Sequence, residues 1–148
     1  MKIISTILLF LFPLFFTNDG TTLFVPEGLE VELWAESPML YNPTNMDVDA
    51  RGRIWVTEAV EYRDFNNKPD TRFNFKNQGD RIIILEDSDQ DGKADKSTVF
   101  VQDMDLKAPL GIAVIGNKVF VSASPHVIVY TDENHDDKPD KKEVFLTG

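Results

Sequence analysis

Residues 81–101 read RIIILEDSDQDGKADKSTVFV, an apolar run followed by an acidic stretch and a second run of β-branched and aromatic residues. The outer runs are typical of strands, and the acidic stretch is typical of a connection between them. The same order returns in residues 126–146, which read HVIVYTDENHDDKPDKKEVFL. Asp87 and Phe100 thereby correspond to Asp132 and Phe145, each pair 45 residues apart. An internal repeat organises the chain.

A predicted hairpin precedes the strand pair in each repeat. The second hairpin turns at Gly116-Asn117, a favoured two-residue turn, and the first turns at residues 50–52. Trp55 corresponds to Phe120 at a spacing of 65 residues, so the first repeat carries an insertion, residues 61–79. The predicted strands cover residues 45–49, 53–58, 81–85, 97–101, 110–115, 118–122, 127–130 and 143–146.

A four-stranded unit that repeats at about 45 residues is typical of β-propeller blades. The expected fold class is therefore all-β, a partial β-propeller of about two four-stranded antiparallel blades. Residues 29–34 alternate apolar and acidic side chains and predict one further, leading strand. The expected boundaries are 23–103 for the first blade, with the leading strand and the insertion, and 104–148 for a second, truncated blade. Because propellers close with four or more blades, we expect a fragment of a longer protein.

In an antiparallel meander, successive turns alternate between the two ends of the sheet. The insertion 61–79 joins the second and third strands, so it lies at one end, together with the connection 102–109. Both acidic stretches join the third and fourth strands and lie at the opposite end. Long insertions in compact domains are commonly functional. A ligand face is therefore expected at the insertion end, with Glu58, Tyr62, Arg63 and Arg72 as candidates; ordinary solvated loop residues are the alternative.

Composition excludes several classes of protein. The formal charge of −10 and scattered basic residues argue against a nucleic-acid partner. The absence of cysteine excludes disulfides, thiolate metal sites and a cysteine nucleophile within the chain. Residues 1–19 begin with Met1-Lys2 and continue with an apolar run, which predicts a signal peptide with an uncertain cleavage site and an exported protein, periplasmic, cell-surface or secreted. An uncleaved N-terminal anchor is the alternative.

The first acidic stretch predicts a calcium loop. Acidic residues alternate with other residues and a glycine, Gly92, follows the third, so several oxygens can converge on one hard cation. Without a cation, the like charges would repel one another at short range. The expected ligands are the side chains of Asp87, Asp89, Asp91 and Asp95 and the carbonyl of Lys93. A solvated acidic turn is the alternative.

The second acidic stretch repeats this pattern imperfectly. It offers Asp132, Asn134, Asp136 and Asp140 as ligands, but Asp137 stands where glycine is expected. A left-handed backbone conformation costs aspartate more than glycine, so a calcium loop and a plain polar turn both remain open. The strand aromatics are expected in the core: Trp34, Trp55, Phe100, Phe120 and Phe145. His126 and His135 receive no catalytic or metal role.

These motifs together resemble a known family. The residues that carry the likeness are 26–31, 42–58 with RGRIWVTE at 51–58, and 81–96. They resemble the start of the exported bacterial membrane-bound dehydrogenases, propellers similar to the glucose/sorbosone dehydrogenases. The resemblance implies an oxidoreductase that uses pyrroloquinoline quinone on a sugar-like alcohol, with a cytochrome c-like domain following in many members. No residue here matches the family's catalytic histidine or cofactor-binding arginines, so the chain is expected to be catalytically incomplete. A non-enzymatic calcium-stabilised binding or adhesion propeller is the alternative.

Overall fold

A computed structural model describes residues 25–60 and 78–148. The chain divides into two units, Met1–Glu32 and Leu33–Gly148. The predicted signal peptide and most of the insertion 61–79 lie outside the described residues. Within the described part, no helix is long and apolar enough to cross a membrane.

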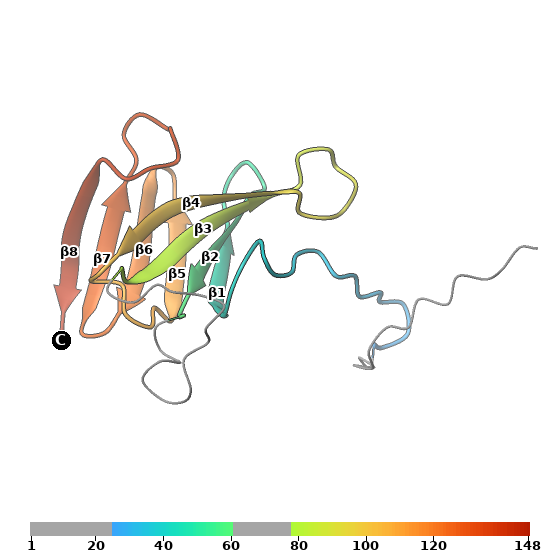
Figure 1. The fold of residues 1–148 in the computed structure, drawn as a ribbon, viewed down its shortest axis with the longest axis horizontal. Helices are drawn as coiled ribbons and strands as arrows, with labels where there is room; N and C mark the ends of the chain where they lie inside the picture. Colours follow the sequence, from blue (N-terminus) through green and yellow to red (C-terminus); the bar gives the residue numbers. More distant parts are fainter. Residues whose placement is uncertain (1–24, 61–77) are drawn as a thin grey trace, which may run out of the picture. The chain divides into compact units, whose positions relative to one another are not determined.

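The unit Leu33–Gly148 contains eight strands in two antiparallel sheets of four (Figure 1). The strands are β1 (Pro43–Val48), β2 (Ile54–Glu58), β3 (Asp80–Glu86), β4 (Lys96–Asp103), β5 (Gly111–Ile115), β6 (Lys118–Ala123), β7 (His126–Thr131) and β8 (Lys141–Thr147). The first sheet has the order β1-β2-β3-β4 and the second β5-β6-β7-β8. The all-β prediction and all eight strands within the sheets are confirmed, with strand ends that differ by at most two residues.

The leading strand predicted at residues 29–34 was wrong. Its backbone is irregular, and Leu29, Val31 and Leu33 are exposed by 68%, 56% and 64%. Alternation of apolar and polar residues fits a strand only where a neighbouring strand supplies backbone hydrogen bonds and a sheet face covers the apolar side chains. No such pairing reaches these residues in the described part of the chain.

The main hydrophobic core lies between the two sheets. From the first sheet it contains Trp55, Ile82, Ile84 and Phe100, and from the second Val119, Val121, Ala123, Ile128 and Tyr130. Leu106, in the connection between β4 and β5, is fully buried in the same cluster. Because side chains alternate between the two faces of a strand, each sheet has one face that packs in this core and a second face that points away from it.

The second face of the first sheet is covered by a segment of the chain. Val56, Ile83 and Leu85 form a separate buried cluster there. Trp34, Met39 and Leu40 are among the residues packed against it, and the Trp34 carbonyl accepts a hydrogen bond of 2.8 Å from the Ala94 N–H. The first sheet is therefore covered on both sides.

The internal repeat extends to details of strand pairing. The β3–β4 ladder shifts register between Ile82 and Ile83, and the β7–β8 ladder shifts between Val127 and Ile128, which are 45 residues further on. Phe100 and Phe145 are the extra residues at these two bulges. A bulge sets the direction of the side chains around it. Because it recurs at equivalent residues, the two sheets are copies of one unit.

The two sheets have the same orientation, so the side chains of the second sheet that correspond to the core residues of the first point away from the first sheet. The expectation that the strand aromatics all lie in the core is corrected accordingly. Trp55 and Phe100 are buried against the second sheet, at 4% and 2% exposure, as predicted. Their counterparts Phe120 and Phe145 point away from the first sheet, and Phe145 is 61% exposed. The prediction that Phe145 packs in the core was therefore wrong, because nothing in the described chain covers that face.

Candidate metal centre

The first acidic loop joins β3 to β4 and holds three carboxylates close together. One oxygen from each of Asp87, Asp89 and Asp91 lies within 4.8 Å of the other two. The Asp87 carboxylate accepts hydrogen bonds from the N–H groups of Asp91 at 3.2 Å and Gly92 at 3.0 Å. Gly92 has φ of 91°, the left-handed conformation expected of it. Three of the four predicted side-chain ligands are thus brought together.

The two other predicted ligands are held differently. The Asp95 carboxylate accepts hydrogen bonds from the Ser88 N–H at 3.0 Å and the Ser88 hydroxyl at 2.5 Å, and these bonds lower the pKa of Asp95. The Lys93 N–H donates to Asp91 at 2.9 Å. Asp95 therefore closes the base of the loop and does not join the other three carboxylates.

The second acidic loop, between β7 and β8, folds like the first. Asp132 accepts hydrogen bonds from the N–H groups of Asp136 at 3.3 Å and Asp137 at 3.0 Å, as Asp87 does from Asp91 and Gly92. Asp140 accepts from the N–H groups of Glu133 and Asn134 at 2.6 and 3.3 Å. The predicted ligands therefore occupy equivalent places, with the neutral Asn134 where the first loop has a carboxylate.

Asp137 takes the glycine position with φ of 65°. Its carboxylate pairs with the Arg53 guanidinium at 2.7 Å, across the two sheets. The same guanidinium pairs with Asp49 at 2.7 Å through its Nε atom. Only 10% of the Arg53 side chain is exposed, so the pair is shielded from solvent. The second loop is therefore anchored to the turn between β1 and β2.

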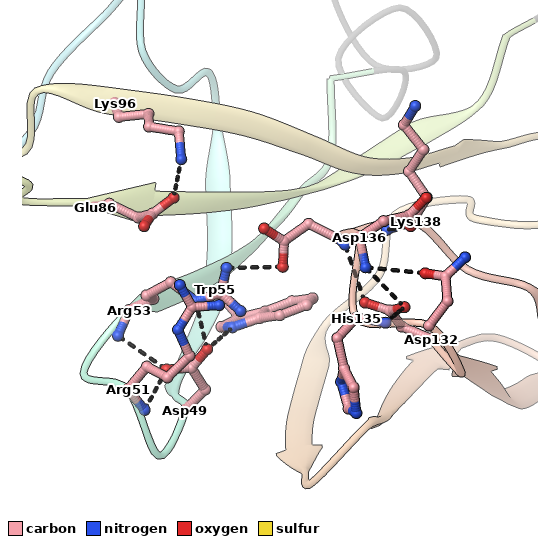
Figure 2. A network of polar contacts seen from close by, with 12 residues as sticks. Asp49, Arg51, Arg53, Trp55, Glu86, Lys96, Asp132, His135, Asp136 and Lys138 are labelled. Carbon is pink, nitrogen blue, oxygen red and sulfur yellow. Dashed lines mark hydrogen bonds and ion pairs between the residues drawn. The ribbon is translucent and has the colours of Figure 1, made fainter.

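Asp49 organises that turn, as Figure 2 shows. Its two oxygens accept hydrogen bonds from the Arg51 N–H at 2.9 Å, the Arg53 N–H at 3.0 Å and the Trp55 indole N–H at 3.0 Å. Burial acts to raise the pKa of Asp49, but the bonds from Trp55 and Arg53 outweigh it and the pKa is lowered. Burial opposes the charged form of Arg53 as well, and the bonds to Asp137 and Asp49 raise its pKa overall.

At the other end of the first sheet, Glu58 is fully buried. It pairs with the Arg81 guanidinium at 2.5 Å and accepts the Tyr41 N–H at 2.6 Å. Burial raises the pKa of Glu58 despite these partners. Glu58 therefore has a structural partner within the sheet. The other candidates for the ligand face, Tyr62, Arg63 and Arg72, lie outside the described residues.

Neither histidine meets a catalytic partner among the described residues. His135 is exposed in the second acidic loop, with φ of 61°. His126 begins β7, and its Nδ1 atom is buried without a hydrogen-bond partner.

Sequence reasoning missed the polar contacts that join the sheets. Asp47 of β1 accepts the Val114 N–H of β5 at 2.7 Å, and the Asn45 amide donates to the Leu110 carbonyl at 3.0 Å. Lys142 of β8 pairs with Asp103 of β4 at 2.6 Å. The one sequence feature that pointed to a contact between the sheets was aspartate in place of glycine at 137. A residue that tolerates a left-handed backbone poorly needs a compensating contact.

Comparison with known proteins gives a family and no described activity. No curated protein and no solved structure matches the chain. A family described as a domain of unknown function, DUF7133, matches residues 18–148, which include both sheets and both acidic loops. The chain belongs to the DUF7133 family.

Proposed function

We propose that this chain is part of an exported, calcium-binding β-propeller of the quinone-dependent sugar dehydrogenase kind, and that it is not catalytic by itself. Two four-stranded meanders packed face to face, both oriented the same way, are the arrangement expected of neighbouring blades. The calcium role rests on geometry, and the dehydrogenase role rests on the resemblance of residues 26–31, 42–58 and 81–96.

One observation carries the calcium proposal: three carboxylate oxygens, from Asp87, Asp89 and Asp91, lie within 4.8 Å of one another. Hard cations favour such oxygen clusters, and calcium completes six to eight ligands with carbonyls and water. The Lys93 carbonyl is proposed as a further ligand, whereas Asp95, which Ser88 holds at the base of the loop, would join the set only by releasing Ser88. In the second loop, Asp132, Asn134, Asp136 and Asp140 are proposed as a weaker site, because an amide replaces one carboxylate.

The proposed quinone is anionic, and binding it requires unpaired cationic groups. Among the described residues, Arg53 and Arg81 are engaged in ion pairs within the fold, whereas Arg51 is exposed in the turn between β1 and β2. The two arginines held inside the fold are therefore not available to bind pyrroloquinoline quinone. The quinone, the sugar-like substrate and a cytochrome c-like domain are proposed for the parent protein only. The second candidate is a calcium-stabilised binding or adhesion propeller without redox chemistry, which needs the calcium loops and no cofactor site.

The calcium proposal is tested by titrating Ca²⁺ into the protein after chelation and following its thermal unfolding. The expected result is a higher melting temperature with Ca²⁺, since a ligand that binds only the folded state stabilises it. Asp89→Asn should weaken this response, and Gln90→Asn in the same loop, which removes no charge, should preserve it. An identical melting temperature with chelator and with Ca²⁺ would sink the proposal.

The two candidate functions are separated in the parent protein. Adding pyrroloquinoline quinone, an aldose and an artificial electron acceptor should give acceptor reduction for a dehydrogenase. A folded, calcium-responsive parent protein that reduces no acceptor under these conditions is a binding propeller.

A further inference from the structure

The second sheet has an outer face, formed by Ile115, Phe120, Val127, Val129, Phe145 and Leu146, that points away from the first sheet. Ile115, Phe145 and Leu146 are exposed by 65%, 61% and 58%. Phe120 and Phe145 make an edge-to-face contact on it, with ring centroids 5.7 Å apart. An apolar face of this kind is unusual on a soluble protein and marks a contact surface.

The repeat indicates what this face is built to contact. Phe120, Val127, Val129 and Phe145 correspond to Trp55, Ile82, Ile84 and Phe100, the residues that the first sheet packs against the second. The aromatic contact is also repeated, since Trp55 and Phe100 lie edge to face at 4.8 Å. The outer face of the second sheet therefore reproduces the surface to which a four-stranded sheet already binds in this protein.

A hollow of about 630 Å³ at one end of the outer face adds a specific feature. Leu110, Ser122, Val127 and Leu146 are among its lining residues. Val127 and Leu146 correspond to Ile82 and Val101, which belong to or pack against the core cluster that buries Leu106. Leu106 precedes β5, the first strand of the second sheet, which packs on the first sheet. The hollow on the second sheet therefore lies where a third sheet would place the side chain equivalent to Leu106.

We propose that the outer face of the second sheet docks a third four-stranded sheet of the same repeat, whose preceding connection inserts an apolar side chain into this hollow as Leu106 does. The inference rests on the proposed propeller architecture and specifies the partner of this face. A second copy of the chain is the poorer occupant, because the matching face of its first sheet is covered by Trp34, Met39 and Leu40.

The proposed interface with a third sheet would be more apolar than the existing interface between the first and second sheets. By strand pairing, Ala113 takes the place of Asp47 and Ile115 the place of Asp49. The Asp47 carboxylate, which accepts the Val114 N–H across the existing interface, therefore has no counterpart on the outer face, and neither has Asp49, which holds Arg53 within the first sheet. Docking should depend mainly on apolar burial, and only an ion pair at Lys118, the counterpart of Arg53, should be sensitive to screening by salt.

The test extends the full chain after Gly148 by a second copy of residues 104–148 and probes the outer face by thiol labelling. The protein has no cysteine, so Phe145→Cys in the original second sheet gives a single probe. Met46→Cys is the matched control, because Met46 is 65% exposed and lies on β1. We expect labelling of Phe145→Cys to slow at least tenfold in the extended protein, with Met46→Cys unchanged.

The hollow is tested in the same protein. In the added copy, serine in place of the residue equivalent to Leu106 should restore labelling of Phe145→Cys, whereas serine in place of its exposed neighbour equivalent to Lys107 should not. Unchanged Phe145→Cys labelling in the extended protein overturns the proposal. So does protection of the original chain that grows with its concentration, which identifies a second copy as the occupant. Neither readout depends on calcium, so failure of the calcium titration leaves this inference standing.

Discussion

Replacing Phe100 with alanine removes the ring that joins the two sheets. Phe100 is 2% exposed, and its ring lies edge to face with Trp55 at 4.8 Å and with Tyr130 of the second sheet at 6.4 Å. Truncation of a buried phenylalanine costs about 3–5 kcal/mol through lost burial and the cavity left behind. Each aromatic contact accounts for about 0.5–1.5 kcal/mol beyond burial. Phe100→Ala should therefore lose a large part of the stability of a single domain, which is about 5–15 kcal/mol.

Phe145→Ala is the matched variant, because Phe145 occupies the same bulge position in the second copy. It is 61% exposed, and its one aromatic contact among the described residues is with Phe120. Its truncation should cost about 1 kcal/mol, the value of one such contact. Urea unfolding of the two variants and of the unmutated chain, extrapolated to zero denaturant, measures the loss of stability in each variant.

Equal losses in the two variants would refute this account, because they would mean that Phe145 is as buried in solution as Phe100. If Phe100→Ala does not fold, Phe100→Leu keeps most of the apolar surface and should still lose more stability than Phe145→Leu.

Three further predictions concern polar and backbone contacts. Asp137→Gly should destabilise by about 1 kcal/mol in urea unfolding, since the lost ion pair with Arg53 outweighs the relief of the left-handed backbone, which is about 1–2 kcal/mol; a gain in stability would contradict this. Burial opposes ionisation of Asp103, but hydrogen bonding to Lys142 lowers its pKa overall. Its stabilisation is therefore present above the ordinary value of 3.8 and lost as pH falls through the lower folded value; Asp103→Asn should flatten that acid-induced loss in thermal melts, and an unchanged slope would count against it. Gly79→Ala should prevent folding, because Gly79 has φ of 80° and an added Cβ would lie 1.7 Å from the Asp103 carbonyl oxygen. Circular dichroism measures this, and a native spectrum would contradict it.

The eight strands in the sheets could be predicted because their information is local. β-branched and aromatic runs, bounded by turns such as Gly116-Asn117, favour strands at each place in the chain. The 45-residue repeat then predicted that the two sheets share one strand order. The three-carboxylate cluster was predictable in the same way, because alternate residues of a tight loop determine it.

The wrong predictions concerned contacts with distant partners. Residues 29–34 have the alternation of a strand, but a strand forms only where another strand pairs with it. Phe145 has the sequence environment of Phe100, but its burial depends on a sheet that must pack over it. Local pattern determines which face a side chain occupies, and only tertiary contacts determine whether that face is covered.

The two acidic loops have diverged in what they contact. In the first, Gly92 adopts φ of 91° without strain, and the loop directs three carboxylates to one point. In the second, Asp137 holds φ of 65° and uses its carboxylate to bind Arg53 of the neighbouring sheet. A left-handed conformation costs a non-glycine residue of order 1 kcal/mol, and an ion pair shielded from solvent compensates for it. The repeated loop therefore has two uses: it gathers three carboxylates, the proposed cation site, in the first copy, and it binds the adjoining sheet in the second.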